Sequence, residues 1–153
     1  MTDVSFYLVS DAMTPGQLDA VLPRLLEKIL AAGHRVVLRC PDEERLQRVD
    51  ELLWREPAEG FLPHAAGTTD ETAAELPVYL TTQPENPTQA DVLVRLAGAP
   101  ADDFAQYLRV VDIFSGTEAD RTAGRERWRT LKDKGYPLAF YTYENGRWQK
   151  KDI

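Results

Sequence analysis

Only one cysteine, Cys40, and two histidines occur among the 153 residues of the sequence. A single cysteine excludes an internal disulfide and any metal site built from several thiolates, which agrees with a reducing compartment. No apolar run reaches about 18 residues and no basic-then-apolar leader begins at Met1, so the sequence predicts neither a membrane span nor a secretory signal. We therefore expect a soluble, cytoplasmic protein without a membrane partner.

Phosphate-binding loops and metal-ligand spacings are also missing. The first apolar segment is followed by SDAMTPG, which matches neither GxGxxG nor the P-loop pattern of a nucleotide-binding strand-to-helix turn. His34 and His64 lack the spacing of a metal site, so we expect no metal and no cofactor. Cys40 precedes the acidic segment PDEER, which would raise the pKa of its thiol, so we expect a packed thiol there.

The remaining composition predicts one domain over residues 1–153. Hydrophobic residues make up 43% of the chain, enough for a single core. Apolar segments alternate with segments of helical periodicity, and this β-α-β-α order is the signature of a parallel sheet covered by helices. Pro23 lies inside the first helical segment, so that helix is expected to begin effectively near it. Strands are expected at residues 4–9, 35–39, 76–80, 91–96, 108–114 and 137–143, and helices at 17–32, 42–53, 102–106 and 117–134.

Positive charge is concentrated in the last of these helices. The chain carries a net charge of −7, yet six cations and two anions between residues 121 and 134 give that segment +4 and leave −11 for the rest. Glu118 and Asp120 stand in the first turn, which complements the helix macrodipole. The acidic remainder argues against broad binding to nucleic acid. A local basic patch is what the sequence offers an anionic partner.

One side of this helix combines cations with an indole. At about 100° per residue, five residues fall within an arc of roughly 100°. This basic face consists of Arg121, Arg125, Trp128, Arg129 and Lys132. A half-exposed indole beside guanidinium groups suits a partner that is both acidic and apolar. The same pattern fits a solvated helix whose Trp128 packs into the core, and both hold if Trp128 lies at the border of the basic face.

Large apolar residues gather in a segment of loop composition after the second predicted helix. They are Trp54, Pro57, Phe61, Leu62 and Pro63. Either they fold back on the domain as a lid, or they form a patch for a partner protein. The following residues 65–75 are small and acidic and predict a mobile loop.

Four stretches of the sequence resemble one protein family. They are VSFYLV near the start, DELLWREPAEGFLPH from Asp50 to His64, VVDIF from Val110 to Phe114, and GRERWRTLKDKGY from Gly124 to Tyr136. The most specific pattern is LW-x-x-PAE-x-F-x-PH, met at Leu53, Trp54, Pro57, Ala58, Glu59, Phe61, Pro63 and His64. Together they resemble the chi subunit family of bacterial DNA polymerase III holoenzyme, and the resemblance runs through essentially the whole chain.

The resemblance implies a non-enzymatic accessory subunit of the clamp-loader complex. Its fold would be a three-layer, Rossmann-like α/β domain with a mostly parallel sheet, helices on both faces and no nucleotide-binding function. Such subunits bridge the loader, through the psi subunit, to the acidic, aromatic-ended C-terminal tail of the single-stranded-DNA-binding protein. DNA would then be only an indirect partner.

The resemblance also assigns roles to residues. Aspartates of the tail would pair with the cations of the basic face, and a guanidinium would grip the terminal carboxylate. The last phenylalanine ring of the tail would lie against Trp128 and Phe114. The family's face usually presents lysine or arginine and a tyrosine, and here Arg121 and Trp128 keep the charge and the ring.

The apolar segment has its own implied partner. The surface that faces the psi subunit corresponds to Trp54, Pro57, Phe61, Leu62 and Pro63. A different protein at the same patch, such as a repair helicase, would satisfy the same physics.

Two other functions remain open from the sequence. Asp11 follows the first predicted strand, where α/β enzymes place catalytic carboxylates, so an enzyme of nucleotide or phosphate metabolism using Asp11 and the basic helix is the alternative. The second is direct binding of single-stranded DNA, with Trp54 or Trp128 stacking on bases. Few aromatic residues interleave with the cations, which disfavours that mode.

Overall fold

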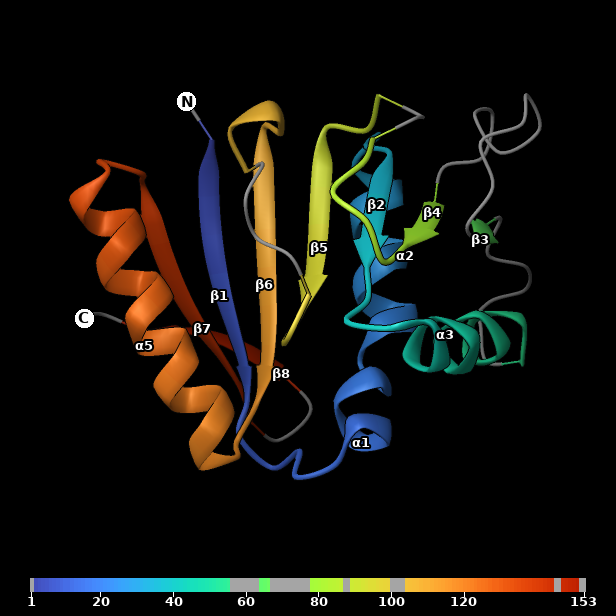
Figure 1. The fold of residues 1–153 in the computed structure, drawn as a ribbon, viewed down its shortest axis with the longest axis horizontal. Coiled ribbons are helices and arrows are strands. Elements are labelled where there is room, and N and C mark those ends of the chain that lie inside the picture. The colour runs from blue at the N-terminus through green and yellow to red at the C-terminus, as the bar shows by residue number, and fades with distance from the viewer. Residues whose placement is uncertain are drawn as a thin grey trace.

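A mostly parallel sheet forms the centre of the computed structural model, which describes residues 2–55, 64–66, 78–86, 89–99, 104–144 and 147–151. These residues form eight strands in the order β3-β4-β2-β5-β6-β1-β7-β8 (Figure 1). All neighbouring pairs are parallel except β7 and β8, which are antiparallel. The strands are β1 (Asp3–Val9), β2 (Val36–Arg39), β3 (His64–Ala66), β4 (Val78–Thr81), β5 (Val92–Leu96), β6 (Arg109–Ser115), β7 (Leu138–Glu144) and β8 (Arg147–Lys151).

Helices cover both faces of this sheet. One face carries α1 (Pro15–Asp19), α2 (Leu22–Ala31) and α3 (Glu43–Arg55), and the other carries α5 (Glu118–Asp133) and the 3-10 helix η1 (Phe104–Gln106). Each face has its own buried cluster, because successive side chains of a strand point to opposite faces. Leu22 belongs to the cluster of the first face, whereas Phe6, Phe114 and Leu131 belong to the cluster beneath α5. The predicted three-layer α/β architecture is confirmed.

Most helices and strands lie where the sequence predicted them. All six predicted strands are present, with ends that differ by at most two residues from the expected ones. The helix expected at 17–32 is divided into α1 and α2, and Pro23 lies in the first turn of α2. Proline is tolerated in a first turn because its missing N–H has no helical partner there. Thr14 caps α1 in a capping box with Gln17.

Four local features differ from expectation. Residues His64–Ala66 form β3 beside β4, where the sequence predicted that a loop began at residue 65. Helix α3 continues to Arg55, so the backbone of Trp54 is helical. The helix expected at 102–106 is described only as the 3-10 turn η1. Strand β8 was not predicted, because four of its five residues are polar and exposed and give no hydrophobic signal.

No helix within these described ranges combines the length and apolarity that crossing a membrane requires.

The position of α5 is set by a close approach between two strand ends. Gly116 lies in the turn from β6 to α5, and its N–H donates to the carbonyl of Ala12, 2.9 Å away, in the turn after β1. A Cβ atom added to Gly116 would lie 2.1 Å from the carbonyl oxygen of Ser10. Because that oxygen belongs to the backbone, no side-chain rotation can relieve the contact. A side chain at this position would push the start of α5 away from the sheet.

We predict that Gly116→Ala lowers the free energy of unfolding by about 2 kcal/mol or more, because the added methyl group overpacks against the backbone. Urea denaturation followed by circular dichroism measures this change. Gly16→Ala is the matched control, since nothing lies within 4 Å of a Cβ atom there. Gly16 is in α1, so its replacement should be neutral or stabilising by up to about 1 kcal/mol. Equal stability of the two variants would contradict the close approach.

Candidate functional site

Helix α5 carries the predicted basic face, and its N-terminal end is firmly fixed. Thr117 is the N-cap and its side-chain oxygen accepts a hydrogen bond from the N–H of Asp120. The Asp120 carboxylate accepts two further bonds, from the Ser115 N–H at 2.9 Å and from the Ser115 hydroxyl at 2.6 Å. These contacts satisfy donors that a helix start leaves open and tie the helix to β6. The rotation of α5 about its axis is therefore set at its first turn.

The buried side of α5 lies on aromatic rings of the sheet. Gly124 faces the ring of Phe114, and an added Cβ atom would be only 3.2 Å from it. Trp128 packs edge-on against Phe6 of β1, with ring centroids 5.2 Å apart, and against Phe140 of β7 at 6.3 Å. Trp128 is half-buried. It therefore lies at the border between the core and the surface, as the sequence indicated.

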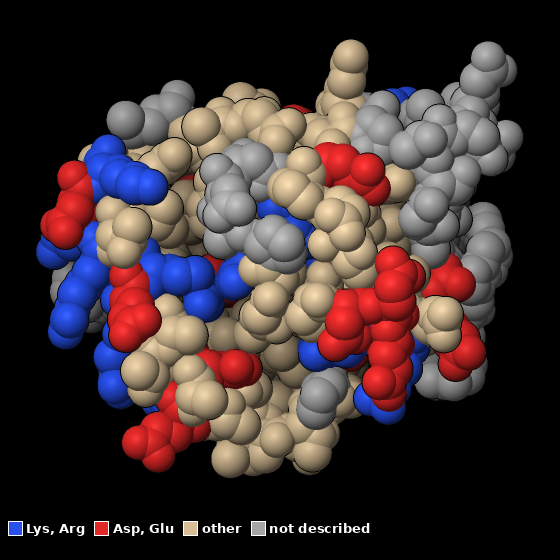
Figure 2. Space-filling model, in the orientation of Figure 1, with Lys and Arg blue, Asp and Glu red and all other residues tan. Residues whose placement is uncertain are grey.

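The exposed side of α5 presents the predicted cations. Arg125, Arg129 and Lys132 are exposed, and none of them has an ion-pair partner within the described part of the chain. Arg121 is half-buried, and its Nε donates to the carbonyl of Gly116 at 3.1 Å. This bond holds the Arg121 side chain at the start of the helix. Figure 2 shows Lys and Arg side chains gathered at the left of the view, where Figure 1 places α5.

The fourth arginine of α5, Arg127, points toward the sheet. The Nε of Arg127 lies 2.6 Å from one carboxylate oxygen of Asp112, and its second nitrogen lies 3.0 Å from the other. Asp112 is fully buried and also accepts a bond from Arg95 at 3.2 Å. Burial lowers the pKa of Arg95, and the charge of Asp112 opposes that shift. Arg127 thus anchors the helix to β6, and it contributes no charge to the basic face.

Phe140, and not Phe114, is the phenylalanine that stands beside Trp128 at the surface. Phe114 is only 4% exposed and lies beneath Gly124, so its ring supports the helix from below. Phe140 is half-buried and stands next to Trp128. Sequence reasoning missed Phe140 because strand β7 alone gave no sign of which helix would cover it. The alternation of β7 groups Phe140 with Leu138 and Thr142 on one face, but it does not say which helix covers that face.

The other predicted partner patch lies mostly beyond the described residues. Pro57, Phe61, Leu62 and Pro63 fall in residues 56–63, outside the described ranges. The backbone of Trp54 lies in the last turn of α3. Its role and that of its four neighbours stay predictions.

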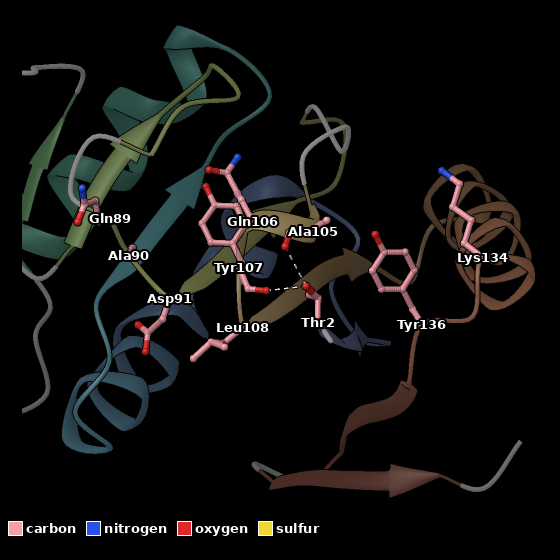
Figure 3. A pocket seen from close by; sticks show the side chains of 10 residues that line it. All are labelled: Thr2, Gln89, Ala90, Asp91, Ala105, Gln106, Tyr107, Leu108, Lys134 and Tyr136. Atoms are coloured by element: carbon pink, nitrogen blue, oxygen red, sulfur yellow. Dashed lines mark hydrogen bonds between the residues drawn. The ribbon is translucent and has the colours of Figure 1, made fainter.

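A separate hollow of about 630 Å³ opens at the amino ends of the strands (Figure 3). It is lined by residues that precede β1, β5, β6 and β7, among them Thr2, Asp91, Leu108 and Tyr136. Parallel α/β sheets place ligand sites at the opposite, carboxyl edge. Burial alone would raise the pKa of Asp91, but hydrogen bonds from His34 and a backbone N–H outweigh it and lower that pKa. None of the predicted site residues lines this hollow.

Neither Cys40 nor Asp11 belongs to the basic face of α5. Cys40 is fully buried, and burial followed by the charge of Asp19 raises the pKa of its thiol to about 12. The expectation of a packed thiol is confirmed. Asp11 is exposed in the turn after β1. Within the described ranges, no group of three or more His, Cys, Asp or Glu residues is arranged to hold a metal ion.

Comparison with known proteins agrees with the sequence motifs. Residues 1–139 match the family model described as DNA polymerase III chi subunit, HolC. The chain is 33% identical to DNA polymerase III subunit chi of Pseudomonas aeruginosa over 138 residues, which cover 90% of this chain and 94% of that protein. It is 31% identical to DNA polymerase III subunit chi of Escherichia coli K12 over 149 residues, which cover 94% of this chain and 100% of that protein.

We predict that Asp112→Asn lowers the free energy of unfolding by about 3 kcal/mol or more, because the buried Arg95 and the half-buried Arg127 lose their counter-charge. Urea denaturation at neutral pH measures the change. Glu44→Gln is the control, since Glu44 pairs with Arg48 on the exposed surface of α3. That variant should lose less than about 1 kcal/mol. A small loss in Asp112→Asn would show that Asp112 does not anchor α5.

We also predict that Cys40 does not react with a thiol reagent in the folded protein, because the thiol is buried and its pKa of about 12 keeps it protonated at neutral pH. The rate of labelling by an aromatic disulfide should rise with urea in step with unfolding. Stoichiometric labelling within seconds in the absence of urea would contradict this placement.

Proposed function

The chain belongs to the DNA polymerase III chi subunit family, and from this premise we propose that it is a non-catalytic accessory subunit of a bacterial DNA polymerase III holoenzyme. In this role it works in the cytoplasm and joins the clamp loader to the single-stranded-DNA-binding protein. The basic face of α5 binds the acidic, aromatic-ended C-terminal tail of that protein. The chain contacts DNA only through this partner.

One observation carries the proposal. Three exposed cations of α5, Arg125, Arg129 and Lys132, surround a half-buried indole and have no ion-pair partners in the described part of the chain. In a chain of net charge −7, such cations have many acidic residues available to them. The acidic tail supplies the missing counter-charge, and its terminal ring finds an aromatic surface at Trp128 and Phe140.

The energetics favour a ring and a carboxylate as the main contacts. An exposed ion pair contributes only about 0–1 kcal/mol, so several of them cannot reach the roughly 8 kcal/mol of a micromolar complex. Burying a phenylalanine ring against Trp128 and Phe140 adds apolar contact. A bidentate bond from Arg121 or Arg125 to the terminal carboxylate adds a charge-assisted contact. We therefore expect weak capture that is sensitive to salt.

The second half of the bridge is the psi subunit. We place its contact, or that of an alternative protein, at Trp54, Pro57, Phe61, Leu62 and Pro63. This assignment is supported by the specific family motif that contains Trp54, Pro57, Phe61 and Pro63. It is also supported by the distance in the fold between α3, at whose end the patch begins, and α5 (Figure 1). Two partners at these places can be bound at the same time.

Direct capture of single-stranded DNA fits the geometry less well. Stacking proteins present several aromatic rings along a basic groove. On the basic face Trp128 is the one ring among the cations, and the residues outside 121–134 carry −11. A peptide of a few residues stays within the basic face, whereas a polynucleotide would extend over acidic surface.

We predict that a labelled peptide ending in an acidic-Pro-Phe sequence binds this protein with micromolar affinity, measured by fluorescence anisotropy. Removing the terminal Phe should abolish binding, because the ring is lost and the terminal carboxylate moves. Arg125→Glu or Trp128→Ala should weaken binding tenfold or more, equivalent to about 1.4 kcal/mol.

Arg24→Glu is the matched control for Arg125→Glu. Arg24 is exposed on α2, on the opposite face of the sheet, and its reversal changes the net charge by the same amount. This variant should bind the peptide within about twofold of the unmodified protein. If both reversals weakened binding equally, or if the peptide without its Phe bound as well, tail capture at α5 would be wrong.

A further inference from the structure

Strand β8 lies beside β7, the strand that carries Phe140, and its register decides which of its side chains project from the α5 face of the sheet. Lys151 pairs with Phe140, and Gln149 pairs with Thr142. Directly opposite residues of an antiparallel pair project from the same face of the sheet. Phe140 faces α5, because its ring lies 6.3 Å from that of Trp128. Lys151 and Gln149 therefore project from the α5 face too, and a 3.5 Å contact between their side chains agrees with this.

The alternation of the strand extends this assignment to its other residues. Arg147 is two residues before Gln149 and shares the α5 face, whereas Trp148 and Lys150 project from the opposite face. On that opposite face Trp148 packs against Tyr7 and Tyr143, with ring centroids 4.6 Å and 4.9 Å apart. These rings hold β8 in place as the last strand of the described sheet. The backbone of β8 is thus held in place, and the strand presents a row of polar side chains on the α5 side.

The charge of this row matches that of α5. Lys151 and Arg147 are both exposed; Arg147 lies directly across from Glu144 of β7, whereas Lys151 lies directly across from the uncharged Phe140. Lys151 is directly across from Phe140, whose ring packs against Trp128, so Lys151 lies on the β8 side of these rings and the helix cations lie on the α5 side. The two rings are therefore flanked by cations on both sides. An acidic segment that reached these rings would be attracted from α5 and from β8.

We propose that β8 is the second wall of the tail-binding site, in which Lys151 contacts an acidic residue that precedes the terminal ring of the tail. This inference rests on the proposed function and adds a specificity-determining element to it. Five strand residues span about 17 Å, which matches five residues of an extended peptide. A tail with its ring at Trp128 and Phe140 can run along β8 over this length. Arg121, Arg125 and Arg129 hold its end from the helix side.

The test compares two neighbouring lysines. Lys151→Glu reverses a charge on the α5 face, and Lys150→Glu reverses an exposed charge on the other face of the same strand. With an acidic peptide ending in Pro-Phe, Lys151→Glu should weaken binding about three- to tenfold and Lys150→Glu by less than about twofold. Lys151→Gln keeps most of the side chain and should weaken binding by about two- to threefold. Urea denaturation of each variant reports whether the fold is kept.

A second peptide isolates the contact. In this peptide the aspartates are replaced by asparagines and the Pro-Phe end is kept. Lys151→Glu and the unmodified protein should bind it within about twofold of each other, because the partners of Lys151 are gone. Equal losses in Lys151→Glu and Lys150→Glu, or a loss in Lys151→Glu that persists with the asparagine peptide, would overturn the role of β8.

The outcome separates this inference from the proposed function. If the unmodified protein binds the acidic peptide and Arg125→Glu loses it, tail capture stands whatever the result for β8. If the unmodified protein does not bind the peptide at all, both inferences fall.

Discussion

The attachment of α5 to the sheet is the interaction on which the rest of the site depends. Gly124 lets the helix backbone approach Phe114, Trp128 packs on Phe6, and Arg127 is paired with the buried Asp112. These three contacts fix the height, the rotation and the lateral position of one helix. Rotation about the axis by one residue would turn about 100° of surface and replace the exposed cations by others. The composition of the basic face is therefore a consequence of what lies underneath it.

Two arginines of the same helix show how this packing sorts charges. Arg125 and Arg127 are separated by about 200° around the helix axis. Arg127 points toward β6 and meets a carboxylate that is fully buried, and Arg125 points away from it into solvent. A buried carboxylate with two guanidinium groups tolerates no rearrangement without leaving a charge unpaired. Asp112 thus commits Arg127 to the interior and leaves the cations of the basic face for a partner.

The sequence predicted the parts of the molecule that are dictated by local patterns. Apolar runs marked β1, β2, β4, β5, β6 and β7, and the amphipathic and charge patterns marked α5. That helix begins after its N-cap Thr117 and ends before Gly135, whose φ of 86° is one that glycine adopts readily. The partial burial of Trp128 also followed from its position at the border of the basic face.

The sequence could not predict contacts that arise only when distant segments meet. The neighbour of Trp128 is Phe140, because β7 lies beside β1 and under α5. In the sequence, Asp112 is a single polar residue within an apolar strand. Its partners Arg95 and Arg127 are 17 and 15 residues away along the chain. Strand β8 has almost no buried side chain, and it is a strand because β7 offers it an edge and Trp148 finds Tyr7 and Tyr143. Periodicity carries no information on such pairings.

Because the basic face of α5 belongs to an otherwise acidic chain, it favours a short anionic partner over a long one. At physiological ionic strength, charges farther apart than about 8 Å are largely screened, so a bound segment responds to the residues it touches. In the proposed site, a short acidic peptide between α5 and β8 would touch mainly cations and the rings of Trp128 and Phe140. A longer polyanion would extend beyond the basic face and meet the rest of the chain, which carries a net charge of −11 outside residues 121–134. The same charge distribution therefore attracts a peptide end and repels a nucleic acid, which agrees with the proposed capture of a protein tail.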